Sequence, residues 1–321
     1  MPRFAIMLSA VLLCVAGTAM GQNWPSKPVR IIVPYAAGGT ADVLGRIMGQ
    51  RLGEAWGQPV VVENRAGANG NVGSDAVVRS TPDGYTLLLG TSGSNAVNPS
   101  LYKTMPFDAW RDLVYAAPVA STANVLLVNA WSPHQMLKDL LDAARAQPGK
   151  ITYGSSGIGS VLHLCGVLFA QKTGVNWVHV AYKGTGPSLT DLLGGQIVSV
   201  FANLPAVVPQ IQSGKMRALA VTSAERDASV PNVPTMIEAG IADYNLSSWF
   251  GLFAPAATPR DVVRKVNADV GRQLQSPEVR QRLLGLGAVP TPMDADAAQR
   301  FYLDELVRWA GVVKASGATA D

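Results

Sequence analysis

The fold is decided by residues 29–42, VRIIVPYAAGGTAD. The stretch begins with an apolar, β-branched run that is typical of a buried strand. Pro34 ends this strand because proline cannot donate to a strand ladder. Two small residues and two glycines follow, and they let the backbone approach a ligand closely. Thr40 is then expected to cap a helix, so the stretch predicts a strand, a turn and a helix N-terminus that favours an anion.

This turn is not a nucleotide-binding P-loop, since it has no lysine and no G-x-x-x-x-G-K-[ST] pattern. Taken alone, it also fits an ordinary turn between a strand and a helix. The interpretation as an anion site therefore depends on the rest of the chain.

Length and composition indicate a globular chain with two domains. The chain has 321 residues, of which 48% are hydrophobic and 15% are charged. That length exceeds what one hydrophobic core comfortably organises. The net charge is +4, and the basic residues are scattered without basic runs, which argues against nucleic acid as a partner. A mildly basic surface favours anionic solutes only weakly.

The N-terminus predicts a signal peptide over residues 1–21. Arg3 supplies a positive charge, and residues 4–16 form an apolar run that is short for a membrane span. Residues 19–21, AMG, resemble a small-x-small cleavage site, which makes Gln22 the first mature residue. We therefore expect an exported protein.

The cysteines and histidines predict neither a disulfide nor a metal site. Lipidation at Cys14 is disfavoured, because a lipoprotein signal has a small residue directly before its cysteine and Leu13 stands there. Cys165 is the one cysteine left after cleavage, and its apolar surroundings favour a buried, inert thiol. No cluster of His, Cys, Asp and Glu has the spacing of metal ligands, so we expect no metal and no cofactor.

Strands and helices alternate along the chain in two units. Residues 29–90 read as strand, helix, strand, helix and strand, which predicts a parallel sheet. A small-residue loop, 91–99, ends this unit. After Trp131 the pattern restarts and offers similar loops at 155–160 and 181–187. Ligands of open α/β sheets bind at such strand ends.

Other elements are read from periodicity alone. Two separate extended segments are expected at residues 114–119 and 125–128, and a helix is expected to open at Ser132-Pro133. Three C-terminal helices are predicted, over residues 261–275, 277–286 and 294–314.

A series of short motifs runs through nearly the whole mature length. They are WPSKP (24–28), PYAAGG (34–39), GQPVVVENR (57–65), PDGYT (82–86), NPSLY (98–102), YKG (182–184), LLGGQ (192–196), GK (214–215), RALAVT (217–222), PNVPT (231–235) and WFG (249–251). Each is weak alone, but their joint order and spacing are specific. In this combination the chain resembles the periplasmic solute receptors of the tripartite tricarboxylate transporter class, the Bug-type or TctC-like receptors.

The resemblance implies an α/β fold of the two-lobed, type II flytrap kind found in periplasmic binding proteins. A central sheet would lie in each lobe, with the ligand cleft between them. Lobe 1 would comprise residues 22–126 and 244–321, and lobe 2 residues 127–243. Segments near residues 120–128 and 247–254 would cross between the lobes as a hinge.

The resemblance also implies a function. The protein would capture a small organic carboxylate in the periplasm and deliver it to a membrane permease of one small and one large subunit. We expect a monomer that is not an enzyme. Two alternatives stay open, a receptor that feeds a membrane sensor kinase or an orphan receptor. A secreted hydrolase is disfavoured, because residues 154–157, GSSG, lack the spacing of the G-x-S-x-G nucleophile elbow.

The family's ligand contacts fall in the loops at the strand ends. Backbone N–H groups and hydroxyls there would replace the hydration of a carboxylate without a buried counter-charge. The Gly39 and Gly159 backbones are expected to donate N–H bonds. The predicted ligand-binding residues are Tyr35, Ala36, Gly39, Thr40, Ser92, Ser94, Asn95, Ser155, Ser156, Gly159, Ser160, Ala181, Tyr182, Ala202 and Asn203.

Two positions leave alternatives open. Ala202 stands where family sequences commonly carry an aspartate. Either it leaves room for a ligand without a basic group, such as a bulkier or aromatic acid, or it only packs the hinge side. Trp249 and Phe250 either stack on a ligand or pack in the core.

Overall fold

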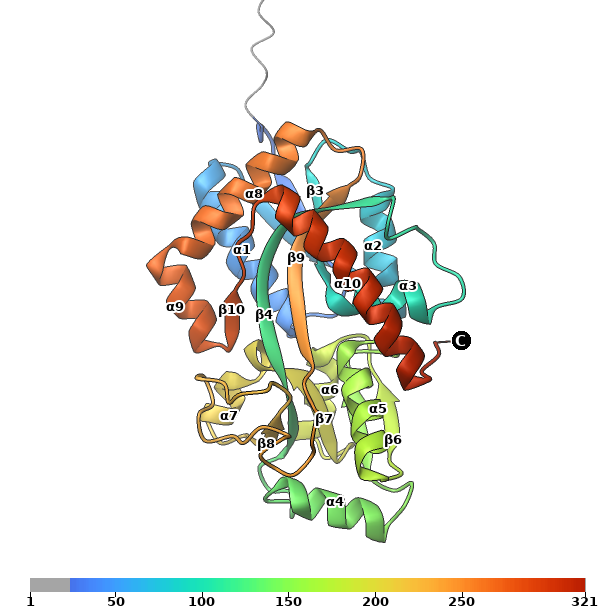
Figure 1. Ribbon diagram of the computed structural model, residues 1–321. Coiled ribbons are helices and arrows are strands. Elements are labelled where there is room, and N and C mark those ends of the chain that lie inside the picture. The colour runs from blue at the N-terminus through green and yellow to red at the C-terminus, as the bar shows by residue number, and fades with distance from the viewer. Residues whose placement is uncertain (1–23, 321) are drawn as a thin grey trace, which may run out of the picture.

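The computed structural model describes residues 24–320 and shows two lobes joined by two long strands (Figure 1). The predicted signal peptide and the cleavage site before Gln22 lie outside the described residues. We call the part built on the first sheet lobe 1 and the part built on the second sheet lobe 2. In Figure 1 lobe 1 is the upper part and lobe 2 the lower part.

Lobe 1 is built on a mixed sheet with the strand order β2-β1-β3-β9-β4, to which β10 is added beside β4. Its strands are β1 (Val29–Val33), β2 (Val60–Asn64), β3 (Thr86–Thr91), β9 (Ser247–Pro255), β10 (Ala288–Pro290) and the first part of β4 (Leu113–Asn129). The strands β1, β2 and β3 are parallel, and β9 is antiparallel to both of its neighbours. The parallel sheet predicted for residues 29–90 is confirmed.

Helices cover both faces of the lobe 1 sheet. They are α1 (Thr40–Trp56), α2 (Asn71–Val78), α3 (Asn98–Leu101), α8 (Arg260–Gln275), α9 (Pro277–Gly285) and α10 (Ala295–Ser316). Alternate residues of β1 enter two cores: Ile31 and Val33 pack with residues of α1 and α8, whereas Ile32 belongs to the core that includes α10. A strand buried on both faces is therefore apolar at successive positions. The three predicted C-terminal helices are confirmed.

Lobe 2 repeats the same arrangement with the strand order β4-β7-β5-β6 and β8 paired to β4. Its own strands are β5 (Thr152–Ser155), β6 (Val178–Ala181), β7 (Ser199–Asn203) and β8 (Met216–Val221). Its helices are α4 (Leu137–Ala146), α5 (Val161–Thr173), α6 (Thr185–Leu193) and α7 (Val208–Gln212). Short helical turns complete the chain at η1 (Ala68–Gly70), η2 (Gly93–Val97) and η3 (Leu204–Ala206).

The strand β4 belongs to both sheets. Residues 113–123 pair with β9 in lobe 1, and residues 124–129 pair with β7 and β8 in lobe 2. The two separate extended segments expected from the sequence are therefore one strand. The small and polar residues between them hid the connection, but residues 120–123 pair with β9 and Asn124 pairs with β7. The division into lobes at residues 126/127 and 243/244 remains a proposal, and it lies close to this crossing.

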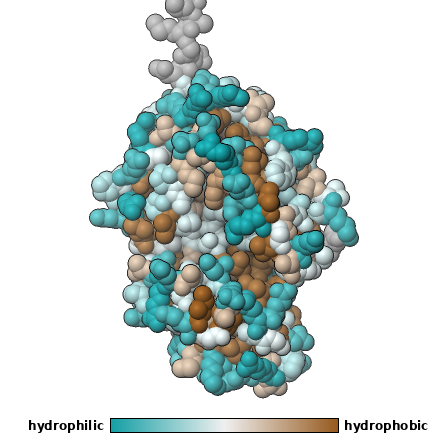
Figure 2. Space-filling model, in the orientation of Figure 1, coloured by the Kyte–Doolittle hydropathy of each residue, from teal (hydrophilic) through white to brown (hydrophobic). Residues whose placement is uncertain are grey.

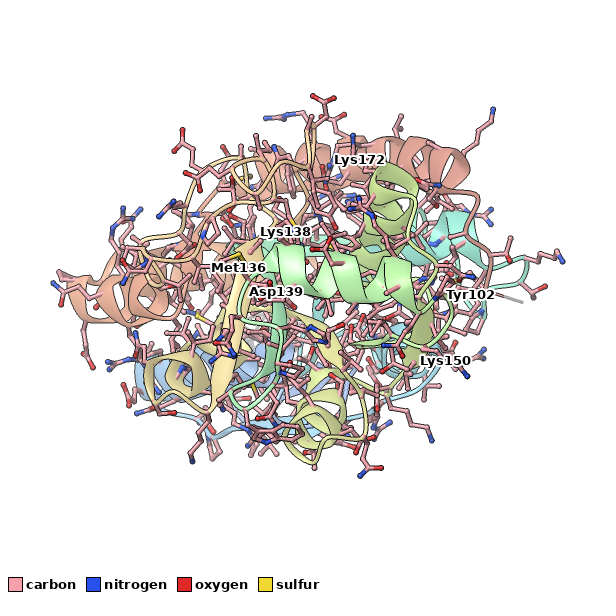
Figure 3. The ribbon with its side chains drawn as sticks, turned by 90° about the horizontal axis from the view of Figure 1, so that it is seen from below. Tyr102, Met136, Lys138, Asp139, Lys150 and Lys172 are labelled. Atoms are coloured by element: carbon pink, nitrogen blue, oxygen red, sulfur yellow. The ribbon has the colours of Figure 1, made fainter. Side chains whose placement is uncertain are left out.

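Two local predictions are wrong. Residues 91–99, expected as a loop, form η2 and the start of α3, because the Thr91 hydroxyl accepts the Ser94 N–H (3.1 Å) and thereby opens a helical turn. The helix expected from Ser132 begins only at Leu137 as α4. Figure 3 shows Met136 and Asp139 at this end of the helix, where the Asp139 carboxylate accepts the Met136 N–H (3.0 Å). An acceptor in the first turn stabilises a helix start there.

The exterior is mostly hydrophilic on the face shown in Figure 2, with apolar residues in separate groups between the polar ones. The large apolar side chains gather instead in the cores on either side of the two sheets. Among residues 24–320 no helix combines the length and the hydropathy that a membrane span requires.

Candidate functional site

A small cavity of about 30 Å³ lies between the lobes, and we call it the inner cavity. Its lining combines hydroxyls, glycines and a few apolar side chains, and none of these lining residues is charged. They are Tyr35, Gly39, Thr40, Ala41, Thr91, Ser92, Gly93, Ser156, Ser160, Val161, Leu162, Thr185, Asn203, Ser248 and Phe250.

Three helices begin at the inner cavity. The first residues of α1 (Thr40), α5 (Val161) and α6 (Thr185) all belong to its lining. Helix α1 comes from lobe 1, and the other two come from lobe 2. The first turn of each helix carries N–H groups without intrahelical partners and the positive end of the helix dipole. These helix starts therefore favour an anion, although the lining has no cationic side chain.

In lobe 1 the start of α1 differs from the prediction. Gly39 is the N-cap, with an extended backbone (φ −90°, ψ 172°), and no side chain caps the helix. Thr40 is the first helical residue, so its hydroxyl cannot reach the N–H groups that an N-cap side chain serves. The Thr40 hydroxyl is buried in the lining of the cavity and has no hydrogen-bond partner among the described residues. A polar ligand would satisfy it.

Asp42 supports the turn before α1. Its carboxylate accepts the Gly38 N–H (3.1 Å) and forms an ion pair with Arg46 (2.9 Å). Burial opposes ionisation of this carboxyl group, but the bonds from Arg46 and Gly38 outweigh burial and hold the pKa of Asp42 below its ordinary value. Asp42 therefore stays ionised, and Arg46 balances its charge.

Tyr35 lies in the loop after β1 and contacts both the segment after β2 and the end of β3. Its hydroxyl lies 3.2 Å from the Thr91 hydroxyl and donates to the Asn69 backbone and side-chain oxygens at 3.3 and 3.2 Å. Burial raises the pKa of Tyr35 to about 12, so the phenol is a neutral group at physiological pH. The glycine-rich stretch around Asn69 was not predicted as part of the site. Its signal is the run GANG at residues 67–70, where Ala68 and Asn69 adopt positive φ.

In lobe 2 the start of α5 is capped from within the chain. The Ser160 hydroxyl accepts the His163 N–H (3.1 Å) and donates to the Gly157 carbonyl (2.8 Å). The Gly159 N–H donates to Nδ1 of His163 (3.2 Å). We expected this N–H to donate to a ligand, which remains a prediction; in the described arrangement the His163 ring accepts it.

A pair of histidines lies beneath this loop. The rings of His163 and His179 stack with their centroids 4.2 Å apart, and Nε2 of His179 is 2.7 Å from the Ser155 hydroxyl. Burial lowers the pKa of His163 to about 4, and burial together with the charge of His163 lowers that of His179 to about 3. Both rings are therefore neutral at pH 7. Through its contact with His179, Ser155 joins the loop before α5 to this histidine pair.

The floor of the inner cavity joins the strands that cross between the lobes. The Asn203 side chain donates to Oδ1 of Asn124 (2.6 Å) and to the Ser248 hydroxyl (3.0 Å), which links β7, β4 and β9. Ala202 is fully buried, pairs with Val125 and belongs to the lobe 2 core rather than to the lining. This position favours the second interpretation of Ala202, packing on the hinge side.

The two aromatic residues of β9 point differently. The Trp249 indole N–H donates to Glu305 of α10 (2.7 Å), which draws this ring into the core. The Phe250 ring lines the inner cavity. Because neighbouring residues of a strand face opposite sides, one packs in the core and the other is in position to contact a ligand.

A second cavity of about 220 Å³, the outer cavity, adjoins the first and shares Tyr35 and Ser156 with it. Its other lining residues come from both lobes. They are Gly67, Ala68, Asn69, Gly70, Tyr102, Gly157, Ile158, Ala181, Tyr182 and Lys183.

The predicted ligand-binding residues are thus distributed over three places. The inner cavity is lined by Tyr35, Gly39, Thr40, Ser92, Ser156, Ser160 and Asn203. The outer cavity is lined by Tyr35, Ser156, Ala181 and Tyr182. Neither lining includes Ala36, Ser94, Asn95, Ser155, Gly159 or Ala202. Contact of these residues with a ligand remains a prediction.

The lobes touch beside these cavities. The Ala36 N–H of lobe 1 donates to the Lys183 carbonyl of lobe 2 (2.9 Å). Next to this bond, a Cβ added at Gly186 would overlap the Ala37 carbonyl oxygen. Backbone meets backbone here, so only glycine fits. Within residues 24–320, no group of three or more His, Cys, Asp or Glu residues is arranged to hold a metal ion.

Comparisons with known proteins agree with this architecture. Residues 44–318 match the family described as the tripartite tricarboxylate transporter family receptor. Protein BugT of Bordetella pertussis is 38% identical over 305 residues, which cover 95% of this chain and 94% of that protein.

Two solved structures of similar proteins contain organic acids. A Rhodopseudomonas palustris protein with adipate is 37% identical, with a TM-score of 0.89 over 92% of this chain and 99% of that one. MatC of the same organism, with bound malate, is 31% identical, with a TM-score of 0.85 over 90% of this chain and 100% of that one. A two-lobed fold, an interlobe cavity and a family match over residues 44–318 together show that the chain belongs to the Bug-type, TctC-like receptors of the tripartite tricarboxylate transporter family.

Proposed function

We propose that this protein captures a small organic carboxylate in the inner cavity and delivers it to a tripartite tricarboxylate-type permease. One observation carries the proposal: the starts of α1, α5 and α6 converge on a cavity whose lining has no charged side chain. Helix N-termini bind anions through fixed N–H groups, and they need no buried counter-charge that would cost desolvation in the free protein.

The two-lobed geometry supports capture by closure. The lining comes from lobe 1, from lobe 2 and from the crossing strand β9, so one ligand would contact all three. A ligand that touches both lobes binds the closed state more tightly and shifts the population towards it. The adipate and malate found in structures of similar proteins support an organic acid as the ligand class.

The remaining parts of the proposal concern location and partners. We propose that residues 1–21 are removed on export and that the mature chain acts in the periplasm as a monomer without catalytic activity. The match to a receptor family supports a binding role. Delivery to a sensor kinase instead of a permease would use the same cavity, and the neighbouring genes would distinguish the two.

A ligand screen tests the proposal. The mature chain is unfolded and refolded to remove any retained ligand, and its melting temperature is then measured against linear dicarboxylates, citrate, aromatic acids and acidic amino acids. Ligand at one hundred times Kd stabilises the folded state by about 2.7 kcal/mol. We expect a saturable shift from one chemical group of acids. A flat response to the whole panel from a refolded, monodisperse protein would contradict carboxylate capture.

A further inference from the structure

The floor of the inner cavity carries a hydrogen-bond network whose direction is set by one backbone group. The Leu246 carbonyl can only accept, and Nδ2 of Asn124 lies 2.9 Å from its oxygen. The amide nitrogen of the buried Asn124 must therefore face Leu246, where it also donates to the Thr222 hydroxyl (3.1 Å). The amide oxygen of Asn124 consequently faces the side chains of Asn203 and Ser248.

This orientation of Asn124 fixes the protons of the two side chains that border the cavity. The Asn124 oxygen carries no proton, so both groups in contact with it must donate: Nδ2 of Asn203 at 2.6 Å and the Ser248 hydroxyl at 2.9 Å. Nδ2 of Asn203 donates its second proton to the Ser248 oxygen (3.0 Å). All the side-chain protons of these two polar groups are thus used within the protein.

The amide oxygen of Asn203 is left as a hydrogen-bond acceptor at the cavity. Within residues 24–320 no group donates to it, although Asn203 is only 6% exposed. In a planar amide the oxygen points away from the groups that the nitrogen contacts, and Asn203 belongs to the lining of the inner cavity. A ligand that covers this oxygen without donating to it loses free energy, whereas a ligand with a donor there gains affinity.

The inner cavity therefore has two sides of opposite hydrogen-bonding character. The starts of α1, α5 and α6 present donors, whereas Asn203 and Ser248 present oxygens without free protons. A carboxylate only accepts, so it is attracted to the helix starts and repelled by the floor. A cavity of about 30 Å³ has room for few atoms, so the group that meets Asn203 must lie close to the carboxylate.

A hydroxyl suits the Asn203 acceptor better than an ammonium group does. The lining has no anionic side chain that would pair with a cation, and three helix N-termini beside it disfavour a positive charge. We propose that the ligand is a hydroxycarboxylate whose hydroxyl, next to the carboxylate, donates to the Asn203 oxygen, and that Asn203 selects for this hydroxyl. The inference rests on the proposed function, because the carboxylate must occupy the helix starts.

The test uses titration calorimetry on the refolded mature chain with two sets of acids that differ in one group at the carbon next to a carboxylate. One set is succinate, malate, fluorosuccinate and aspartate, and the other is butanoate with hydrogen, hydroxyl, fluorine or an amino group. Fluorine is similar to a hydroxyl in size but cannot donate. In each set that binds, we expect the hydroxy acid to bind about fivefold more tightly than the other three, the contribution of one neutral hydrogen bond.

Two variants assign the preference to Asn203. Asn203→Ala removes the acceptor, so the preference for the hydroxy acid over its parent should disappear, whereas a merely structural role would weaken both acids equally. Asn129→Ala is the matched control. Asn129 is another buried asparagine, which donates to the Leu192 and Leu193 carbonyls (both 3.0 Å) and lies outside both linings. This control should keep the wild-type preference.

The outcomes separate hydroxyl selection from carboxylate capture. A preference that survives in Asn203→Ala, equal binding of the parent, hydroxy and fluoro acids, or tightest binding of the amino acid would each overturn the selection and leave capture intact. The wild-type comparison decides by itself if Asn203→Ala does not fold. If neither set binds but another acid of the wider panel does, the hydroxyl selection fails alone. If no acid binds, the proposed function fails first.

Discussion

The two helices that face each other across the inner cavity begin in similar loops but satisfy their first N–H groups differently. In lobe 1, α1 starts after Gly39 without a side-chain cap, and the Thr40 hydroxyl has no partner among the described residues. In lobe 2, the Ser160 hydroxyl caps α5 by accepting the His163 N–H, and the His163 ring accepts the Gly159 N–H just before the helix. We infer that lobe 1 holds the donors that a carboxylate needs, and that lobe 2 mainly closes over it.

The difference between the two helix starts predicts different effects of variants in the two lobes. A helix start that is already capped is stable without ligand, whereas an uncapped start leaves donors unsatisfied until a ligand arrives. If binding energy is concentrated at α1, variants of lobe 1 should lose affinity without losing stability. Variants that remove the cap of α5 in lobe 2 should instead lower the free energy of unfolding.

The largest effect is expected from Gly186→Ala, which tests whether the lobes must meet. The new Cβ would overlap the Ala37 carbonyl oxygen, so the closed form would be strained by about 3 kcal/mol and affinity should fall about a hundredfold. Calorimetry measures the affinity, and small-angle scattering measures whether ligand still compacts the molecule. Gly271→Ala in α8, where an added Cβ meets nothing within 4 Å, is the control. Wild-type affinity in Gly186→Ala would refute the need for this contact.

The next effect is expected from Thr40→Val, which removes the unpartnered hydroxyl and keeps the shape. Affinity for the carboxylate should fall by about 1.5–3 kcal/mol, the range for a hydrogen bond to a charged group. The unfolding free energy should stay the same or rise, since the hydroxyl bonds to nothing in the free protein. Thr258→Val removes another buried hydroxyl without a partner, outside the cavity, and should leave affinity unchanged. Unaltered binding by Thr40→Val would argue against lobe 1 as the main source of affinity.

A smaller effect is expected from Ser160→Ala in the opposite wall. Loss of the cap on α5 should lower the unfolding free energy by about 1 kcal/mol in urea titrations. Asp294→Ala removes the corresponding cap of α10, where the carboxylate accepts the Ala297 N–H (2.7 Å), and should lower stability without touching affinity. A loss of affinity in Ser160→Ala without loss of stability would reverse the roles that we assign to the two lobes.

The smallest effect is expected on mild acidification, from pH 7 to pH 6. The pKa values of His163 and His179 are lowered to about 4 and about 3, below the value near 6.5 of an unfolded chain. The unfolded chain therefore takes up protons first, and stability falls as the pH drops through 6.5. The loss at pH 6 should be less than about 1 kcal/mol per histidine.

The melting temperature of His163→Gln, measured at both pH values, checks this expectation. This variant should lose less stability on acidification than the wild-type chain, whereas His134→Gln, outside the stacked pair, should behave as the wild type does. Identical pH dependence in all three proteins would show that the pair does not couple acidity to folding.

Much of the fold was predictable because its signals are local. The apolar run of β1, the glycine after α1 and the periodicity of the C-terminal helices all appear within short windows of sequence. The continuity of β4 was not predictable in this way, because residues 120–123 gain their strand structure from pairing with β9, more than one hundred positions later in the chain.

The site was predicted at the level of loops rather than of side chains. The loops after β1, β3, β5 and β6 do line the cavities, since strand ends converge at one edge of a sheet. Which groups in a loop are free to bind a ligand depends on residues outside the loop. The His163 ring accepts the Gly159 N–H. Helix α1 has Gly39 as its N-cap, one residue before the predicted cap Thr40. Asn69 and Tyr102 were missed because their loops reach the outer cavity only through tertiary packing.

The central claim is that the inner cavity holds a charged carboxylate at uncharged donors. Titration calorimetry of the refolded mature chain with the best acid of the panel and with its isosteric primary amide tests it directly. The amide keeps the shape but loses the charge that the helix starts favour. We predict that the acid binds at least about tenfold more tightly than the amide, a difference of about 1.4 kcal/mol. Equal affinity for the two compounds would contradict the account.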